Sequence, residues 1–558
     1  MSTHRAGLGV SPGVVAGPVA RLAAPPRPPA DEKPGDDPVA ELARVDAALD
    51  QVARTLQERA QATSGDAADV LTATALMARD PSLHSSIQGL LEQGRPTVAS
   101  LDSAIESVCD VLAGLGGYMA ERAGDLRDVR NRALAVLLGL PMPGIPHPGH
   151  PFVLVGHDLS PADTATLDPA EVLAIVTEEG GPTSHTAILA KGLGVPAVVR
   201  CPSSRDLEDG TLVVVDGSTG SVIADPAPDL VTQALEQADA RRRLTATGAG
   251  PGRTADGTAV ALLVNIATID DAHRAAALDC EGVGLFRTEG MYLGRHSAPT
   301  LEEQEAGYRE VLTAFAGRKV VVRTLDAGAD KPLAFVEHGD EENPALGVRG
   351  LRVSWRHPEL LQTQLQALGR AAASTASDVW VMAPMVATPS EAADFVASAR
   401  AAGLSVAGAM IEVPAAALRA DRVLAEVDFV SIGTNDLAQY TFAADRMQGE
   451  LAALLDPWQP ALLDLIAAVG AAGERAHVPV GVCGEAAGDP LLACVLVGLG
   501  VRSLSMAPGL IATVRLVLAA HSLEECRAMA AAARDAVDGV TAREAVRALA
   551  GEAVRALI

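Results

Sequence analysis

The sequence predicts a multidomain α/β protein that ends in a (β/α)8 barrel, and three observations support this prediction. The chain has 558 residues, which is more than one typical hydrophobic core holds. From about residue 256 onward, eight β-like runs alternate with Ala/Leu-rich helical stretches, as in a barrel of this kind. Before that point, a long helical stretch interrupts the short apolar runs that are typical of a β/α domain.

Composition and charge exclude several classes of protein. Hydrophobic residues make up 49% of the chain and aromatic residues only 3%, so we expect aliphatic, helix-rich cores. The net charge is −26 and no run is rich in Lys and Arg, which argues against a nucleic-acid partner. The chain has no basic-then-apolar leader and no apolar run long enough to span a bilayer, so no direct membrane insertion is expected.

Cysteine usage points to a reducing compartment. The cysteines are scattered and none has C-x-x-C spacing: Cys109, Cys201, Cys280, Cys483, Cys494 and Cys526. This pattern predicts neither a disulfide framework nor a zinc site. A cytoplasmic location is expected.

The first part of the chain alternates between strand-like and helical patterns. Residues 7–22 contain short β-branched pieces separated by Gly and Pro, and a linker rich in Pro and Asp follows. From residue 39 to about 140, apolar residues recur at spacings of three and four, which predicts a bundle of four or five helices. A proline-rich hinge at 141–151 ends the bundle, and four apolar strands follow it: 152–155, 172–176, 197–199 and 212–215.

We therefore expect four parts in the chain. Residues 1–23 and 141–228 form a β/α domain, into which residues 24–140 insert a helical bundle. Residues 229–250 contain a polar linker helix, which covers about 229–247. Residues 251–558 form the barrel, with strands expected at 260–266, 282–286, 319–323, 380–384, 406–411, 428–432, 479–483 and 503–506.

One histidine stands where a helix is expected to begin. Gly180, Gly181 and Pro182 predict a tight turn, and Thr183 and Ser184 are favourable N-cap residues before an Ala/Leu-rich helix that starts just past His185. A phosphate carried on this imidazole would lie at the positive end of the helix, so His185 is a candidate nucleophile. A histidine that only caps a helix in an α/β domain is the alternative.

Charged and reactive residues follow five of the expected barrel strands, where the active site of this fold lies. Arginine forks bind phosphate and carboxylate groups, so Arg287, Arg323 and Arg446 suit a small ligand that carries both. Glu412 and Asp436 offer hard oxygen ligands for Mg²⁺, and Asn435 is a possible donor to the ligand. Structural salt bridges at the strand ends are the alternative for any one of these residues.

The sequence allows two interpretations of Cys483. A cysteine that ends a buried strand is often a small core residue. Beside arginines and a metal, however, its pKa is expected to fall toward neutrality, which would make it a proton donor.

These runs together resemble enzyme I of the bacterial phosphotransferase system, a phosphoenolpyruvate-utilising enzyme. The resemblance covers nearly the whole chain, because the run from Gly180 to Val199 and the barrel runs, with 343–352 and 431–446 among them, occur in the family's order and spacing. It implies that His185 is phosphorylated and that Arg287, Arg323, Arg446 and Asn435 bind phosphoenolpyruvate, with Arg349 a further arginine of the site. It also implies that Glu412 and Asp436 bind Mg²⁺, that Asp436 lies in the substrate site, and that Cys483 protonates enolpyruvate to give pyruvate.

The resemblance also implies partners and a moving domain. The carrier protein HPr is expected to dock on the helical insertion, and the barrel is expected to form a homodimer. The β/α domain that carries His185 is expected to swivel, with the proline-rich hinges and the linker helix as its means. Two alternatives stay open: an enzyme like phosphoenolpyruvate synthase or pyruvate phosphate dikinase, and a non-catalytic regulatory relay.

Three positions depart from the family's pattern. Pro182 stands where Arg is common, Gly290 where an apolar aromatic is usual, and Ala329 where a second Gly is usual. None of them removes a proposed ligand, so we expect effects on rate and affinity rather than on the type of reaction.

Overall fold

The computed structural model divides the chain into two compact units, Met1–Ala190 with Val195–Leu235 and Lys191–Gly194 with Glu236–Ile558. It describes residues 3–23, 25–61, 71, 74–115, 117–159, 163, 167–168, 170–181, 185–247, 249–292, 295, 297–329, 333, 335–336, 341–445 and 449–555. The expected α/β multidomain fold class is confirmed, and each unit is described separately below.

The first unit contains one mixed sheet of eight strands in the order β1-β8-β7-β3-β4-β5-β6-β2. The pairs β3–β4, β4–β5 and β5–β6 are parallel, whereas the pairs β1–β8, β8–β7, β7–β3 and β6–β2 are antiparallel. The strands are β1 (Thr3–Ala6), β2 (Leu8–Ser11), β3 (Val14–Arg21), β4 (Phe152–Gly156), β5 (Val172–Thr177), β6 (Ala197–Val199), β7 (Leu212–Asp216) and β8 (Ser221–Ala224). The four strands expected after the hinge are therefore present.

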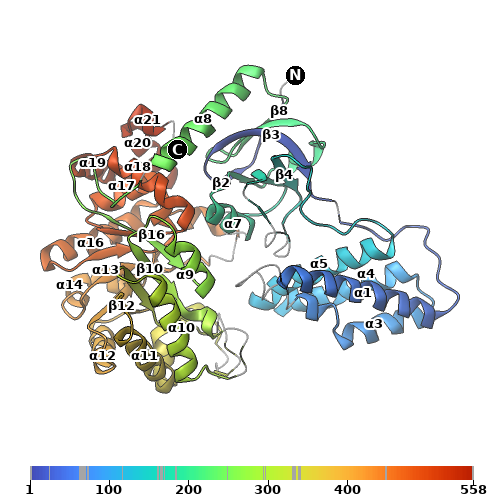
Figure 1. Cartoon of the computed structure of the whole chain (residues 1–558), viewed down its shortest axis with the longest axis horizontal. Helices are drawn as coiled ribbons and strands as arrows, with labels where there is room; N and C mark the ends of the chain where they lie inside the picture. The colour runs from blue at the N-terminus through green and yellow to red at the C-terminus, as the bar shows by residue number, and fades with distance from the viewer. Residues whose placement is uncertain are drawn as a thin grey trace. The chain divides into compact units, whose positions relative to one another are not determined.

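A helical bundle lies between β3 and β4 in the chain, and these two strands pair with each other. Its described helices are α1 (Pro38–Gln61), α3 (Pro81–Glu92), α4 (Thr97–Leu115) and α5 (Gly117–Leu137), which lie side by side in Figure 1. The predicted apolar stripe of α1 forms part of the bundle core, with Val45, Leu49, Val52 and Leu56 buried. The Pro/Asp-rich linker also contacts the bundle, because the carboxylate of Glu32 accepts hydrogen bonds from the first-turn amides of Val98 and Ala99.

One buried arginine ties the proline-rich hinge to the bundle. Arg132 on α5 is fully buried and donates to Asp128 at 2.7 Å, to Asp163 at 3.0 Å and to the carbonyl of Pro143 at 2.9 Å. A buried charge is tolerated only when it is paired in this way. The start of the hinge is therefore anchored to helix α5.

The polar linker helix expected near residues 229–247 is present as α8 (Pro228–Thr247). The division between the two units falls within this helix. Among the described residues, none of the helices is long and apolar enough to cross a membrane.

The second unit is a closed barrel of eight parallel strands in the order β10-β11-β12-β13-β14-β15-β16-β9. All eight expected strands are present: β9 (Ala261–Ile266), β10 (Gly282–Arg287), β11 (Lys319–Arg323), β12 (Asp378–Ala383), β13 (Val406–Ile411), β14 (Val430–Ile432), β15 (Val480–Val482) and β16 (Ser503–Met506). Figure 1 shows helices surrounding these strands. They include α9 (Ile269–Ala276), α10 (Leu301–Ala314), α11 (Pro358–Ala373), α12 (Pro389–Ala401), α13 (Pro414–Leu418), α14 (Ala420–Val423), α15 (Thr434–Phe442), α16 (Pro460–Ala476), α17 (Pro490–Gly498), α18 (Ile511–Ala519), α19 (Leu523–Arg534), α20 (Gly539–Leu549) and α21 (Glu552–Arg555).

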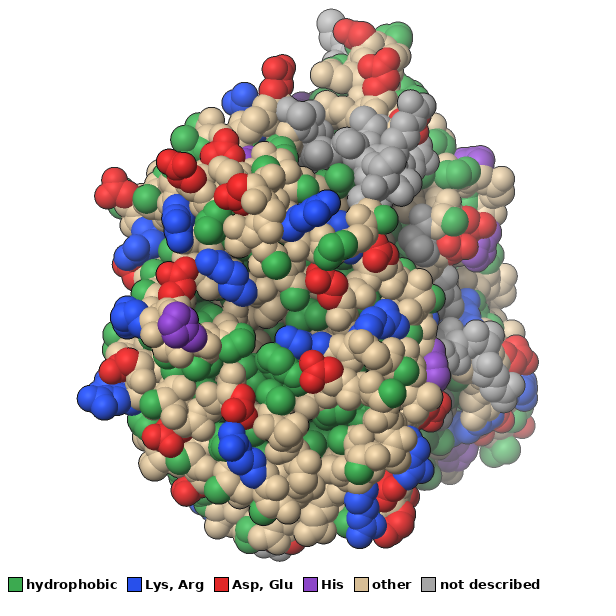
Figure 2. All heavy atoms as spheres, turned by 60° about the vertical axis from the view of Figure 1, so that its left-hand side comes forward, with side chains coloured by type: hydrophobic (Ala, Val, Ile, Leu, Met, Phe, Trp, Pro, Cys, Tyr) green, Lys and Arg blue, Asp and Glu red, His purple; other side chains and the backbone are tan. Residues whose placement is uncertain are grey.

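Side chains fill the barrel, so it is a packed core rather than a pore. Leu285, Val321, Met382, Met410 and Phe429 form one buried cluster that also includes Cys483. On the face of the molecule drawn in Figure 2, acidic and basic side chains are interspersed around a hollow with hydrophobic side chains. On this face, the net negative charge is not gathered into a patch of one sign.

Candidate active site

The ends of the barrel strands carry the expected site residues. Arg287 ends β10 and Arg323 ends β11, and these two residues are direct partners in the register of the adjacent strands. Glu412 follows β13, and Asp436 lies in the first turn of α15, just after β14. The residues therefore lie at the carboxyl ends of the strands, which is the functional end of such a barrel.

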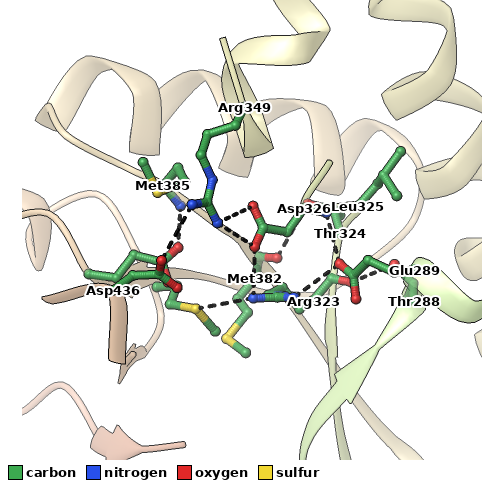
Figure 3. A network of polar contacts seen from close by, with 12 residues as sticks. Thr288, Glu289, Arg323, Thr324, Leu325, Asp326, Arg349, Met382, Met385 and Asp436 are labelled. Carbon is green, nitrogen blue, oxygen red and sulfur yellow. Dashed lines mark hydrogen bonds and ion pairs between the residues drawn. The ribbon is translucent and has the colours of Figure 1, made fainter. Parts of the chain in front are cut away.

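Arg323 is held by two carboxylates. Its guanidinium lies 3.0 Å from Glu289 and 3.2 Å from Asp326, and the side chain is nearly inaccessible (Figure 3). Burial lowers the pKa of this arginine, but the carboxylates of Glu289, Asp326 and Glu412 outweigh burial and raise it above its ordinary value. Arg323 is therefore a fixed buried cation.

Arg349 bridges two strand ends. Its guanidinium donates to Asp326 at 3.1 Å and to Asp436 at 3.4 Å, and Figure 3 shows it pointing between these two acids. Tyr440 on α15 accepts a further hydrogen bond of 3.3 Å from Arg349. Asp326 thus pairs with both Arg323 and Arg349. Arg349 also pairs with Asp436, which is a predicted metal ligand.

Glu412 is a buried acid among other acids. Its exposed fraction is 1%, and it accepts a hydrogen bond of 2.6 Å from the backbone amide of Met385, which has a left-handed φ of 58°. Burial and the carboxylates of Asp436 and Asp326 raise the pKa of Glu412 to about 8. The local excess of negative charge suits a divalent cation.

Cys483 is buried at the top of the barrel core, and its thiol donates to the carbonyl of Ile432. The expectation that its pKa falls toward neutrality is wrong. Burial raises the pKa of Cys483 to about 11, because desolvation of the thiolate outweighs the attraction of Arg323 and Arg287. At neutral pH the group is a thiol that carries its proton.

Two asparagines fix the backbone around this cysteine. The side-chain oxygen of Asn435 accepts a hydrogen bond of 3.2 Å from the amide of Glu485. Asn265 on β9 donates to the carbonyl of Cys483 at 3.2 Å and accepts from Ser505 at 2.6 Å. Asn435 therefore supports the loop after β15, in addition to its expected role toward a ligand.

Some residues singled out from the sequence are described only in part or not at all, and Thr183 and Ser184 are among those outside the described residues. His185 is the first residue of helix α7 (His185–Leu193), so the helix begins at this residue rather than just past it. The structure describes the backbone of His185 but not its side chain. Arg446 and Pro182 lie outside the described residues.

Comparison with known proteins gives three family matches in chain order. Residues 6–122 match the N-terminal part of phosphoenolpyruvate-utilising enzymes, residues 148–220 match their mobile domain, and residues 241–523 match their phosphoenolpyruvate-binding domain. A phosphoenolpyruvate-protein phosphotransferase of Streptomyces coelicolor is 50% identical over 99% of this chain and 100% of its own length.

The chain belongs to the phosphoenolpyruvate-protein phosphotransferase family.

Further members of the phosphotransferase family are similar over most of their length. The phosphotransferase of Haloferax volcanii is 40% identical over 87% of this chain and 87% of its own length. That of Geobacillus stearothermophilus is 38% identical over 93% of each chain. These full-length matches favour a phosphotransferase over the two alternatives considered from the sequence.

Several residues of this candidate site make contacts that the sequence does not predict. They are the carboxylates of Glu289 and Asp326, the amide of Asn265 and the hydroxyl of Tyr440. Glu289 and Asp326 lie in the same strand-end runs as Arg287 and Arg323. Their position in the sequence therefore indicates that they lie near the candidate site. Asn265 and Tyr440 are distant in the sequence from the residues that they contact, and the pattern of residues alone does not reveal these contacts.

Proposed function

We propose that this phosphotransferase moves the phosphoryl group of phosphoenolpyruvate to His185 and then to a histidine of the carrier protein HPr. The observation that carries the proposal is the buried pair Arg323 and Arg349, joined by Asp326, at the barrel strand ends of a chain in this family. Fixed cations of this kind stabilise charge on a transferring phosphoryl group without reorganisation.

Arg287, Arg323, Arg446 and Asn435 would bind the phosphate and carboxylate of phosphoenolpyruvate, with Arg349 and Asp436 beside them. Support comes from Arg323, whose buried Nε has no hydrogen-bond partner among the described residues. A buried donor without a partner is costly, and an anionic ligand would satisfy it. Arg287 extends the same surface, because it is the register partner of Arg323.

Glu412 and Asp436 would hold Mg²⁺, and their chemistry fits this ion. Two carboxylates leave coordination positions for water and substrate phosphate, which is how Mg²⁺ is usually bound. When bound, the ion would neutralise negative charge that develops on the phosphate and the enolate.

The chain's own residues would carry out the proton and phosphoryl transfers. A ring nitrogen of neutral His185 attacks phosphorus, so that an N–P bond forms while the P–O bond to enolpyruvate breaks. Cys483, which keeps its proton because burial raises its pKa, donates that proton to the enolate carbon and yields pyruvate. Solvent then reprotonates the thiolate, and phospho-His185 passes its phosphoryl group to HPr.

The helical bundle would be the docking surface for HPr. Support comes from two large apolar side chains that the bundle exposes, Leu76 and Val111, each with an exposed fraction of 62%. A homodimer through the barrel is proposed on similar grounds, because Leu346 and Trp355 of the second unit are also strongly exposed. A cytoplasmic location agrees with the six cysteines, all of which are unpaired.

Exchange of label between pyruvate and phosphoenolpyruvate tests the proposal. With Mg²⁺ and no nucleotide, the protein should form labelled phosphoenolpyruvate from labelled pyruvate in the presence of unlabelled phosphoenolpyruvate. Addition of EDTA should stop the exchange. Net formation of phosphoenolpyruvate from pyruvate that depends on ATP would instead favour an enzyme of the dikinase type, and no exchange under any of these conditions would favour the relay.

A further inference from the structure

A buried glutamine behind the barrel strands contacts two of the strand ends that carry arginines. Gln364 lies on helix α11, and its exposed fraction is 1%. Its amide nitrogen donates to Thr288 Oγ1 at 3.0 Å and to the hydroxyl of Tyr308 at 2.9 Å. Its amide oxygen accepts from the backbone N–H of Leu325 at 3.0 Å. Three hydrogen bonds therefore converge on one side chain.

These contacts fix the orientation of the amide. Leu325 offers only an N–H, so the group that faces it must be the acceptor oxygen, and the nitrogen must face the two hydroxyls. A glutamate would lack both donors, and a methionine of similar length would lack donor and acceptor. The site therefore requires an amide.

Two of the three contacts, those to Thr288 and Leu325, end beside an arginine of the proposed substrate site. Thr288 directly follows Arg287, and its hydroxyl donates to the backbone carbonyl of Arg323 at 3.0 Å. Leu325 lies two residues beyond Arg323 on the same loop. Gln364 thus holds the backbone of the Arg323 loop at two points. It contacts Leu325 directly, and it reaches the carbonyl of Arg323 through Thr288, the residue after Arg287.

A small pocket, partly open to solvent, adjoins the loop and α11. It is lined by Thr324, Leu325, Ser354 and Gln364 among others. The hydrogen bond from Leu325 to Gln364 joins two residues of this lining and so ties the loop to the helix.

We propose that Gln364 is a positioning residue that sets the placement of Arg287 relative to Arg323 and, through it, the affinity for phosphoenolpyruvate. This inference rests on the proposed roles of those two arginines in substrate binding. Gln364 lies on an outer helix and acts only through the backbone of the strand ends. Its loss should weaken binding of the substrate and leave the later transfer to HPr unaffected.

The experiment compares Gln364→Met with Gln366→Met in the full-length protein. Gln366 is an exposed residue of the same helix, so its replacement controls for the change of residue type. The apparent KM for phosphoenolpyruvate is measured by isotope exchange with pyruvate, and transfer from the phosphorylated protein to HPr is measured separately. For Gln364→Met we expect KM to rise about tenfold, because Arg287 and Arg323 are no longer held in their binding positions, with less change in the maximal rate. Gln366→Met should match the wild type.

Two further variants make the result decisive. Thr288→Val removes the hydrogen bond from Gln364 and the one to the carbonyl of Arg323, but it leaves the contact between Gln364 and Leu325 in place. It should also raise KM, and it replaces Gln364→Met if that protein does not fold. Arg323→Ala in the same assay tests the site itself, and an unchanged KM for it would overturn the proposed substrate site. If Arg323→Ala raises KM while Gln364→Met and Thr288→Val only lower the melting temperature, Gln364 is structural and the positioning role is wrong.

Discussion

Cys483 shows how a single residue depends on its surroundings. The arginines that were expected to lower its pKa toward neutrality are present, but burial dominates and keeps the thiol protonated. A protonated thiol is the form that can give a proton to an enolate carbon. The residue therefore keeps its proposed role for a different physical reason.

Replacement of Cys483 by Ala should affect one half-reaction only. Formation of phosphoenolpyruvate from pyruvate requires removal of a methyl proton, so isotope exchange should fall by about 10²–10⁴-fold. Transfer from the phosphorylated protein to HPr should not change. Retained exchange in Cys483→Ala would show that another group handles the proton.

The raised pKa of Glu412 predicts that protons compete with Mg²⁺. The pKa is raised above the ordinary carboxyl value, so the metal-free protein loses stability as pH rises toward about 8, where this buried group ionises. Mg²⁺ binds the ionised form. The ion should therefore raise the melting temperature more at about pH 9 than at about pH 6.5.

Calorimetric scans with and without Mg²⁺ at both pH values would test this, with Glu412→Gln as the control. The variant should lose most of the Mg²⁺ effect at both values. An equal shift at both pH values for the wild type would contradict the assigned metal ligand.

At the scale of elements, the strands and helices follow from local sequence, whereas the contacts between their ends do not. The eight barrel strands lie within a few residues of their expected positions because β-branched runs bounded by turn residues define them. The roles of Asp326 and Gln364 depend on which strands become neighbours and on how deeply each side chain is buried. Neither property is visible in the spacing of residues.

Gly350 illustrates a tight approach between elements that the sequence does not reveal. It has a φ of 59°, and an added Cβ would lie 2.9 Å from Met385 and 3.2 Å from the carboxylate of Asp326. Gly403 also has a positive φ, of 87°, but its Cβ would meet nothing within 4 Å. The two glycines form a matched pair for separating backbone strain from crowding at the site.

Gly350→Ala should destabilise the protein more than Gly403→Ala and should also raise the KM for phosphoenolpyruvate. For Gly403→Ala we expect only the cost of the left-handed backbone, about 1–2 kcal/mol in urea unfolding, with KM unchanged. Equal effects of the two variants on both stability and KM would show that the region around Asp326 tolerates a shift.

At the scale of the whole molecule, the two proposed half-reactions fall on different units. The first unit contains His185 and the bundle and has its own hydrophobic cores, whereas the arginine cluster belongs to the second. His185 must therefore serve two sites, which motivates the proposed swivel about the linker helix α8. Arg132 anchors the hinge at Pro143, so we expect that hinge to contribute less to the motion.

A fragment of residues 1–235 should separate the half-reactions. It should accept label from phosphorylated HPr, because it retains His185 and the bundle, but it should take none from phosphoenolpyruvate. The full chain is the control, and circular dichroism would check that the fragment is folded. Label on the fragment from phosphoenolpyruvate would show that the barrel is dispensable for the first step.

The role of His185 as the phosphorylated nucleophile can be tested by transfer of ³²P from phosphoenolpyruvate to the full-length protein with Mg²⁺, compared between wild type and His185→Ala. We expect acid-labile, alkali-stable label on the wild type only, and this label should leave the protein when HPr is added. Equal labelling of both proteins would show that His185 is structural and that another residue is the nucleophile.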